Sequence, residues 1–220
     1  VSVMTSTSPL WGAELDHIRL DSADPGQLVA FYRSAFAMAD LPLEDGTKLL
    51  HGKERRLIIG EGSRSEQPYS AFRFPDKSLL NSFKSYLTVQ GMNLIPSPSP
   101  LFDSGAFAIA DPDGRQVAFG LPAIIQQETE DIPKGPAPGR LQHVVVATTN
   151  LFQMANFYGK TLGFVPTDHV LRDEADGSKT LTAIFYRSTS EHHSFAMFLS
   201  DTARPDHHAY EVSSWDDIRD

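Results

Sequence analysis

Four histidines in the second half of the sequence have the residue type and spacing expected of a metal-dependent site. His143 lies near the start of the run QHVVVAT, the pair His192-His193 precedes the run SFAMFL, and His208 lies in HHAYEV. The 220-residue sequence contains no cysteine. Any transition metal must therefore be held by imidazoles and carboxylates, and a disulfide framework is excluded.

Strand periodicity assigns a facing direction to two of these histidines. In QHVVVAT, alternation places His143, Val145 and Ala147 on one face of a strand. The later run HAYEV matches HVVVA in pattern, so we expect His208, and not His207, to be the structural counterpart of His143. Because successive strand side chains point to opposite faces, His207 should then be exposed at the end of its strand.

The adjacent pair His192-His193 belongs to a separate predicted strand, HSFAMFL. Its alternation predicts that His193, Phe195 and Met197 share one face, with Leu199. We expect Phe195 and Met197 to line an apolar pocket beside His193. An imidazole suits acid–base chemistry in such a pocket because its ordinary pKa lies near neutrality.

The elements that must position these residues occur twice in the chain. The segment from Leu15, LDHIRLDSADPGQLVAFYRSAFAM, aligns without a gap on the segment from Leu141, LQHVVVATTNLFQMANFYGKTLGF. His17 thereby corresponds to His143. Each copy has the pattern of a strand followed by a helix.

Capping residues and apolar spacing predict the helix in each copy. Asp24 followed by Pro25 has the pattern of an N-cap with proline in the first turn, and Asn150 is the corresponding cap of the second helix. That helix should end near Gly163. Its apolar face is formed by Leu151, Met154, Phe157, Tyr158 and Leu162.

A second correspondence is weaker in identity but similar in pattern. The segment YSAFRFPDKSLLNSF, from Tyr69, matches HHAYEVSSWDDIRD, from His207, and pairs Ser70 with His208. The first half also contains GAFAIADPDGRQVAFG, in which Asp-Pro-Asp-Gly joins two β-runs and favours a hairpin.

These repeats predict the domain organisation. Residues 14–121 should form a first domain of two modules, residues 122–139 a linker rich in proline and polar residues, and residues 140–220 a second domain. The second domain should contain one complete module. Its second module is expected to stop on its first helix.

Composition limits the classes of partner. The net charge of −9 comes without a cluster of lysine or arginine, which argues against nucleic-acid and anionic-membrane partners. No apolar run approaches the ~18 residues of a membrane span. The opening VSVMTSTSPLWG lacks a basic start and a long apolar centre, so we expect a flexible leader and a cytoplasmic protein.

The module layout, with EHHSFAMFLSD and DHHAYEVSSWDD, resembles the vicinal oxygen chelate superfamily, which includes glyoxalase I, bleomycin- and fosfomycin-resistance proteins and the extradiol dioxygenases. It is most similar to the type I extradiol ring-cleavage dioxygenases of the dihydroxybiphenyl type. The resemblance implies an α+β fold in which repeated βαβββ modules form open-barrel domains, with the metal site in the second.

The same resemblance implies roles for individual residues. His143 and His208 would be ligands of Fe(II), with Mn(II) or Zn(II) as less expected metals. His193 would be the acid–base residue that does not bind the metal. The expected partners are a catechol-type aromatic diol, O₂ and further copies of the chain in a homo-oligomer. Two histidines and one carboxylate leave positions on iron open for a diol and O₂.

The first domain is not expected to hold a metal. Ser70 stands where His208 stands in the second domain, and Ala118 stands where the superfamily carries a ligand glutamate. We therefore expect His17 to be a structural remnant. The matching carboxylate of the second domain is expected beyond Asp220, which would leave the 220-residue chain with weak metal binding, no activity and an open sheet edge prone to self-association.

Two other functions share parts of this pattern. A glyoxalase-type lyase or isomerase using Zn²⁺, Ni²⁺ or Mn²⁺ would use the same framework of His143 and His208. A non-catalytic binding protein of the bleomycin-resistance kind needs no ligands, so interior histidines count against it. His51 and His169 have no supporting pattern, and we expect His51 to be solvated.

Overall fold

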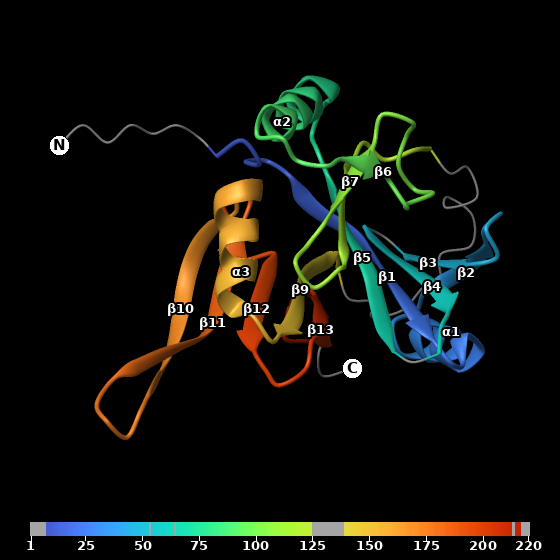
Figure 1. Cartoon of the computed structure of the whole chain (residues 1–220). Helices are drawn as coiled ribbons and strands as arrows, with labels where there is room; N and C mark the ends of the chain where they lie inside the picture. The colour runs from blue at the N-terminus through green and yellow to red at the C-terminus, as the bar shows by residue number, and fades with distance from the viewer. Residues whose placement is uncertain (1–7, 53, 64, 125–138, 213, 217–220) are drawn as a thin grey trace.

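The computed structural model describes residues 8–52, 54–63, 65–124, 139–212 and 214–216 (Figure 1). Most of the predicted linker, residues 125–138, lies outside this part of the chain, so the domain boundaries stay a prediction. Figure 1 shows two β-sheets side by side, with helix α3 across one sheet and helices α1 and α2 at opposite sides of the other.

The first sheet has eight strands in the order β2-β3-β4-β1-β5-β8-β7-β6. Two copies of a βαβββ module build it. The first copy comprises β1 (Glu14–Ser22), α1 (Pro25–Ala35), β2 (Ala39–Pro42), β3 (Lys48–Gly52) and β4 (Arg55–Glu61). The second comprises β5 (Glu66–Arg73), α2 (Lys77–Val89), β6 (Ile95–Pro96), β7 (Phe107–Ala110) and β8 (Gln116–Gly120).

The second sheet has five strands in the order β10-β11-β12-β9-β13. Its elements are β9 (Leu141–Thr148), α3 (Leu151–Ala155), the π-helical η2 (Asn156–Leu162), β10 (Val165–Asp173), β11 (Lys179–Arg187), β12 (Phe195–Leu199) and β13 (Arg204–Tyr210). Strand β9 pairs parallel with β12 and antiparallel with β13, just as β1 pairs with β4 and β5. The predicted α+β fold of repeated βαβββ modules is confirmed.

The helix caps follow the sequence pattern. Asp24 Oδ1 accepts a hydrogen bond from the backbone of Gln27 at 2.9 Å, and Asn150 Oδ1 accepts one from Gln153 at 3.1 Å. Gly163, with φ +85°, ends the second helix in the left-handed conformation that glycine favours. Between these caps the helix changes from α to π at Asn156, which the apolar spacing did not predict.

The N-terminal residues described by the structure pack on the second domain. The Gly12 amide donates to the Ser188 carbonyl at 2.7 Å, the Ser188 hydroxyl donates to the Ala13 carbonyl at 2.6 Å, and Leu10 is fully buried. The expected flexible leader is therefore wrong for residues 8–12, because Leu10 is buried in the apolar core. Residues 1–7 lie outside the described residues.

The predicted Asp-Pro-Asp-Gly hairpin forms between β7 and β8 and also joins the two sheets. Asp111 Oδ1 accepts from the backbone amides of Asp113 and Arg115, both at 2.9 Å. The Tyr158 hydroxyl, on η2, donates to Asp111 Oδ2 at 3.1 Å, and the Arg115 guanidinium donates to the Ala147 carbonyl on β9 at 3.1 Å. One turn of the first domain is thus bonded to two elements of the second.

The apolar core is continuous between the two sheets. The ring centroid of Phe72, on β5, lies 5.3 Å from that of Phe164, which follows η2, and both side chains are buried. Within the described part of the chain, no helix is long and apolar enough to cross a membrane.

Candidate metal centre

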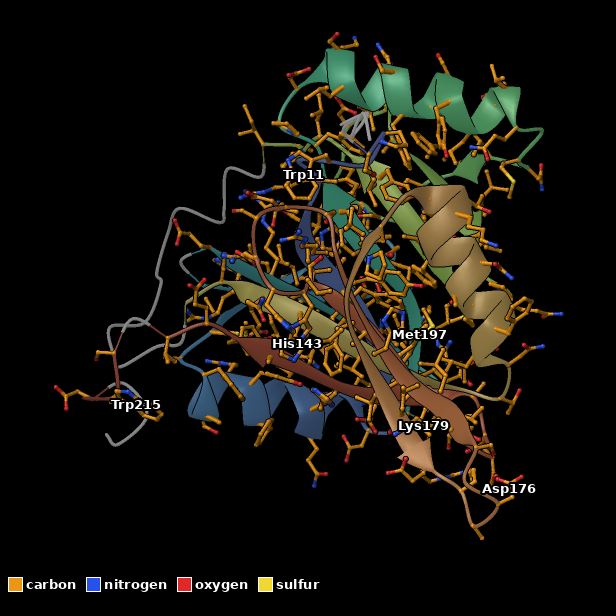
Figure 2. The ribbon with its side chains drawn as sticks, turned by 90° about the vertical axis from the view of Figure 1, so that its left-hand side faces the viewer. Trp11, His143, Asp176, Lys179, Met197 and Trp215 are labelled. Atoms are coloured by element: carbon orange, nitrogen blue, oxygen red, sulfur yellow. The ribbon has the colours of Figure 1, made fainter. Side chains whose placement is uncertain are left out.

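Three histidines meet on one face of the second sheet. His143 lies on β9, His207 on β13, and His193 two residues before β12. The ring centroid of His143 is 4.4 Å from that of His193 and 5.5 Å from that of His207. Figure 2 shows His143 near the middle of the molecule, whereas Asp176 marks the projecting tip of the β10–β11 hairpin.

The register of β9 and β13 decides which histidine joins His143. Val145 pairs with His207, and Val144 pairs with His208. Because paired residues share a face and neighbours alternate, His207 lies on the face of His143 and His208 on the opposite face. The prediction that His208 is the counterpart of His143 is wrong. The pattern match placed the strand one residue out of register, and such a shift reverses every side chain.

His208 instead forms a contact between the domains. The Tyr32 hydroxyl, on α1, forms a hydrogen bond of 3.0 Å with His208 Nε2. Burial lowers the pKa of His208 to about 4, and burial raises the pKa of Tyr32 to about 12. Both groups are therefore neutral near pH 7, which suits a buried hydrogen bond between them.

In both His143 and His207, the preceding residue determines which ring nitrogen carries the proton. His143 Nδ1 bonds to Gln142 Oε1, and His207 Nδ1 bonds to Asp206 Oδ2 at 2.7 Å. Amide and carboxylate oxygens only accept, so each Nδ1 carries a hydrogen, and in the neutral form of each ring Nε2 carries the lone pair. No residue within the described part of the chain hydrogen-bonds either Nε2. This is the tautomer that an Nε2 metal ligand needs.

The charge state of the cluster also favours metal binding. Burial, with smaller contributions from His193, His207 and His208, lowers the pKa of His143 to about 4. Burial, followed by the charges of His192 and His207, also lowers the pKa of His193. Near neutral pH these imidazoles are uncharged, and a neutral imidazole is the form that coordinates a metal.

His193 is held by its own neighbours rather than by a metal ligand. Its Nδ1 lies 2.9 Å from His192 Nδ1, and His192 Nε2 lies 3.0 Å from Asp168 Oδ2. The carboxylate only accepts, so a neutral His192 holds its hydrogen on Nε2. His193 then donates from Nδ1 and keeps a lone pair on Nε2.

Phe195 and Met197 do not lie beside His193, so the prediction that they line a pocket there is wrong. Phe195 and Met197 are buried on the other face of the sheet, where Phe195 stacks on Tyr158 at 4.0 Å between ring centroids. The strand begins only at Phe195, so its alternation does not extend back to His193. Phe185 contacts His193 instead, with ring centroids 5.0 Å apart.

The face that carries the histidines is apolar elsewhere. Val145 pairs with Ala196, which pairs with Phe185, and Ala147 pairs with Phe198. Val145 and Ala196 are buried, while Phe185 and Phe198 remain half-buried. This face could contact an aromatic ring beside the imidazoles.

The donor set fits two ligands of a divalent ion. Both are imidazoles with a bare Nε2, a ligand type that iron, zinc and related metals accept. Among residues 8–216 with the gaps noted above, no group of three His, Cys, Asp or Glu side chains is arranged to hold a metal. A carboxylate ligand is therefore not assigned to any described residue.

The first domain uses the same strand positions differently. His17 is fully buried, with Nδ1 2.7 Å from Asp16 Oδ2 and Nε2 2.7 Å from Ser99 Oγ. Arg19 pairs with Tyr69 as Val145 pairs with His207, so Tyr69 occupies the ligand-candidate position. Both His17 nitrogens are satisfied, which supports the prediction of a structural residue.

The remaining histidines lie outside the cluster. His51, on β3 between β2 and β4, is buried, so the expectation that it is solvated is wrong. Burial and the charge of Arg56 lower the pKa of His51. His169 is exposed on β10.

The sequence of the second sheet matches a known family. Residues 140–220 match the model of the Glyoxalase/Bleomycin resistance protein/Dioxygenase superfamily. The predicted resemblance to this superfamily is confirmed. None of the curated proteins is similar enough in sequence to be matched.

Solved structures with the same fold include dioxygenases and a glyoxalase. A halotolerant catechol dioxygenase, BphC, has a TM-score of 0.78 at 18% identity, over 96% of this chain and 73% of its own. The 2,3-dioxygenase LapB from Pseudomonas sp. KL28 has a TM-score of 0.77 at 18% identity, over 96% and 78%. The Mn(II)-bound glyoxalase from Novosphingobium aromaticivorans has a TM-score of 0.71 at 16% identity, over 94% and 67%. At these identities the likeness shows the fold.

Proposed function

We propose that the second domain binds a divalent metal through His143 and His207, and that the protein is an extradiol dioxygenase of catechol-type diols using Fe(II) and O₂. The observation that carries this proposal is the pair of imidazoles on one face, each with Nδ1 occupied and Nε2 bare. His193 lies beside His143, and its Nδ1 faces His192 instead of an amide or carboxylate oxygen. The fold shared with catechol dioxygenases supports the choice of reaction.

Bound Fe(II) would supply open coordination positions and the redox chemistry of ring cleavage. The chain's own residues then bind and orient the diol. Phe185 and Phe198 present half-buried apolar surface on the face that carries the histidines. The ring of a diol placed against them would keep its two hydroxyls toward His143 and His207.

His193 is the group that moves a proton in this proposal. Its Nε2 carries the lone pair, because its Nδ1 donates to His192. A diol hydroxyl directed at His193 Nε2 can pass its proton there, and the same atom can return it to product. The lowered pKa of His193 means that the imidazole releases this proton readily near neutral pH.

A glyoxalase-type reaction is the second candidate. It is favoured by the shared fold of the Mn(II)-bound glyoxalase and needs the same two imidazoles. The two reactions differ in the metal and in the requirement for O₂. A non-catalytic binding protein would have no use for two imidazoles held as Nδ1–H tautomers.

The deciding experiment uses metal-free protein in a form that supplies a third, carboxylate ligand, because two imidazoles alone are not expected to support turnover. It loads this protein anaerobically with Fe(II), Mn(II) or Zn(II) and then adds a catechol with and without O₂. We expect a yellow ring-fission product only with Fe(II) and O₂ together. Turnover of a hemithioacetal with Mn(II) or Zn(II) and no O₂ requirement would favour the glyoxalase reaction. Absence of metal binding by calorimetry would contradict both.

A further inference from the structure

Gln142 contacts both functional parts of the histidine cluster. Its Oε1 bonds to His143 Nδ1, and its Nε2 lies 2.7 Å from the carbonyl oxygen of His193. The same Nε2 lies 3.2 Å from Glu191 Oε2. One side chain therefore joins a ligand candidate on β9 to the segment that carries the proposed acid–base residue.

The direction of these bonds is fixed by what each atom can do. A backbone carbonyl and a carboxylate only accept, so the amide must present its NH₂ group to His193 and Glu191. Its oxygen is then left for His143. Because that oxygen also only accepts, His143 Nδ1 must donate, and its Nε2 must be bare. Arg140 pairs with Glu191 and so holds one of the two acceptors in place.

We propose that Gln142 is a positioning residue that sets the proton of His143 on Nδ1 and, through the same amide, holds the backbone that places His193. The importance of this for catalysis rests on the proposed function. The tautomer and the placement rest on the contacts alone and can be measured without metal.

The first domain shows what the amide adds. Asp16 precedes His17 as Gln142 precedes His143, and Asp16 also accepts from the histidine Nδ1, at 2.7 Å. A carboxylate can accept from the histidine Nδ1, but it cannot also donate a hydrogen bond. At position 142 it would lose the donation to the His193 carbonyl and would place a second negative charge beside Glu191.

Two variants separate the two interactions of Gln142, acceptance from His143 Nδ1 and donation to the His193 carbonyl. Gln142→Met has a similar length and removes both the acceptor and the donor. Gln142→Glu keeps an acceptor for His143 Nδ1 but cannot donate to His193. Asp16→Asn is the matched control, since it alters the equivalent contact in the domain whose histidine is structural.

The readout is ¹⁵N NMR of the imidazole nitrogens in metal-free protein. We expect His143 to be mainly Nδ1–H in the wild type and in Gln142→Glu, and to shift toward Nε2–H in Gln142→Met. The His193 ring signals should move in both variants. Asp16→Asn should leave His143 unchanged. Retention of the Nδ1–H form in Gln142→Met, with unmoved His193 signals, would overturn the proposal.

Metal affinity supplies the independent second readout. With Zn²⁺ as the probe, Gln142→Met should weaken binding by about 10–100-fold, as expected for loss of an outer-shell partner. Gln142→Glu should weaken it less, because it still orients His143. No Zn²⁺ binding by the wild type, together with the expected NMR changes, would contradict the proposed function and leave the role of Gln142 intact. Binding with an unchanged tautomer in Gln142→Met would contradict the role of Gln142 alone.

Discussion

His17 and His143 occupy the same position in two copies of one module, yet their rings are in different situations. In both, Nδ1 is held by the residue before the histidine, Asp16 or Gln142. His17 Nε2 is also bonded, to Ser99, whereas His143 Nε2 has no hydrogen-bond partner among the residues described. A histidine with both nitrogens satisfied is structural, and one with a bare Nε2 can bind a metal.

The neighbours of the two rings extend this difference. Tyr69 and Phe102 pack edge-on against His17, with centroids 5.9 and 5.1 Å away. Around His143 the ring neighbours are His193 and His207. The shared backbone places a histidine at one strand position in both domains. The residues that meet its Nε2 decide whether it can do chemistry.

The largest effect on metal binding should come from replacing one of the two adjacent histidines on β13 and not the other. His207→Gln should remove metal binding more severely than the about 10–100-fold loss typical of an outer-shell partner, because a ligand itself is lost. His208→Gln should leave metal affinity unchanged, since its ring faces Tyr32. Calorimetry with Zn²⁺ measures both. The reverse result would contradict the assignment of faces from the strand register.

The next effect concerns His193, which is placed beside the ligand candidates but bonded to His192. In protein with a complete set of metal ligands, His193→Phe should leave Fe(II) content nearly unchanged and lower turnover by the ~10²–10⁴ associated with losing a general acid or base. Iron analysis and catechol turnover in the same preparation measure the two quantities. Lost iron would make His193 a ligand, and unchanged turnover would remove it from the mechanism.

The sequence was sufficient to predict the repeated modules and where most of the helices begin and end. The repeat around His17 and His143, the caps at Asp24 and Asn150, and the end at Gly163 are local signals. Each depends on residue type and short spacing, which the sequence states directly. The change to a π-helix at Asn156 had no such signal.

The facing direction of the histidines depends on information that is not local. His207 and His208 are adjacent, so their roles depend on the register of β13 against β9. A usable signal was present in the residue types. An oxygen-bearing residue precedes His17, His143 and His207 and accepts from Nδ1 in each case, whereas His208 is preceded by a histidine.

A smaller effect, on stability, should follow from removing the hydrogen bond between Tyr158 and Asp111, which links the two domains. Tyr158→Phe removes the hydroxyl that donates to Asp111, and leaves a buried carboxylate oxygen without that partner. We expect the free energy of unfolding to fall by about 1–3 kcal/mol. Urea unfolding measures it, and Tyr86→Phe is a suitable control because its hydroxyl makes only an exposed contact of 3.4 Å. An equal loss of unfolding free energy in both variants would show that the hydrogen bond between Tyr158 and Asp111 does not stabilise the protein more than an exposed contact does.

The smallest effect is a pH dependence of the free energy of unfolding that arises from Asp111. Burial raises the pKa of Asp111 above its ordinary value of 3.8, against the opposing charge of Arg115. Between the ordinary and the raised pKa, the folded protein binds more protons at this group than the unfolded chain does. The free energy of unfolding contributed by Asp111 therefore falls as pH rises through that window.

Asp111→Asn isolates this contribution because an amide keeps an oxygen for the turn amides but cannot ionise. The difference in unfolding free energy between wild type and variant should decrease as pH rises from about 4, the ordinary pKa of a free aspartate. The groups common to both proteins cancel in the difference. Urea unfolding at a series of pH values measures it. A difference that increases with pH would show that Arg115 outweighs burial at Asp111, and that the turn joins the domains as an ion pair.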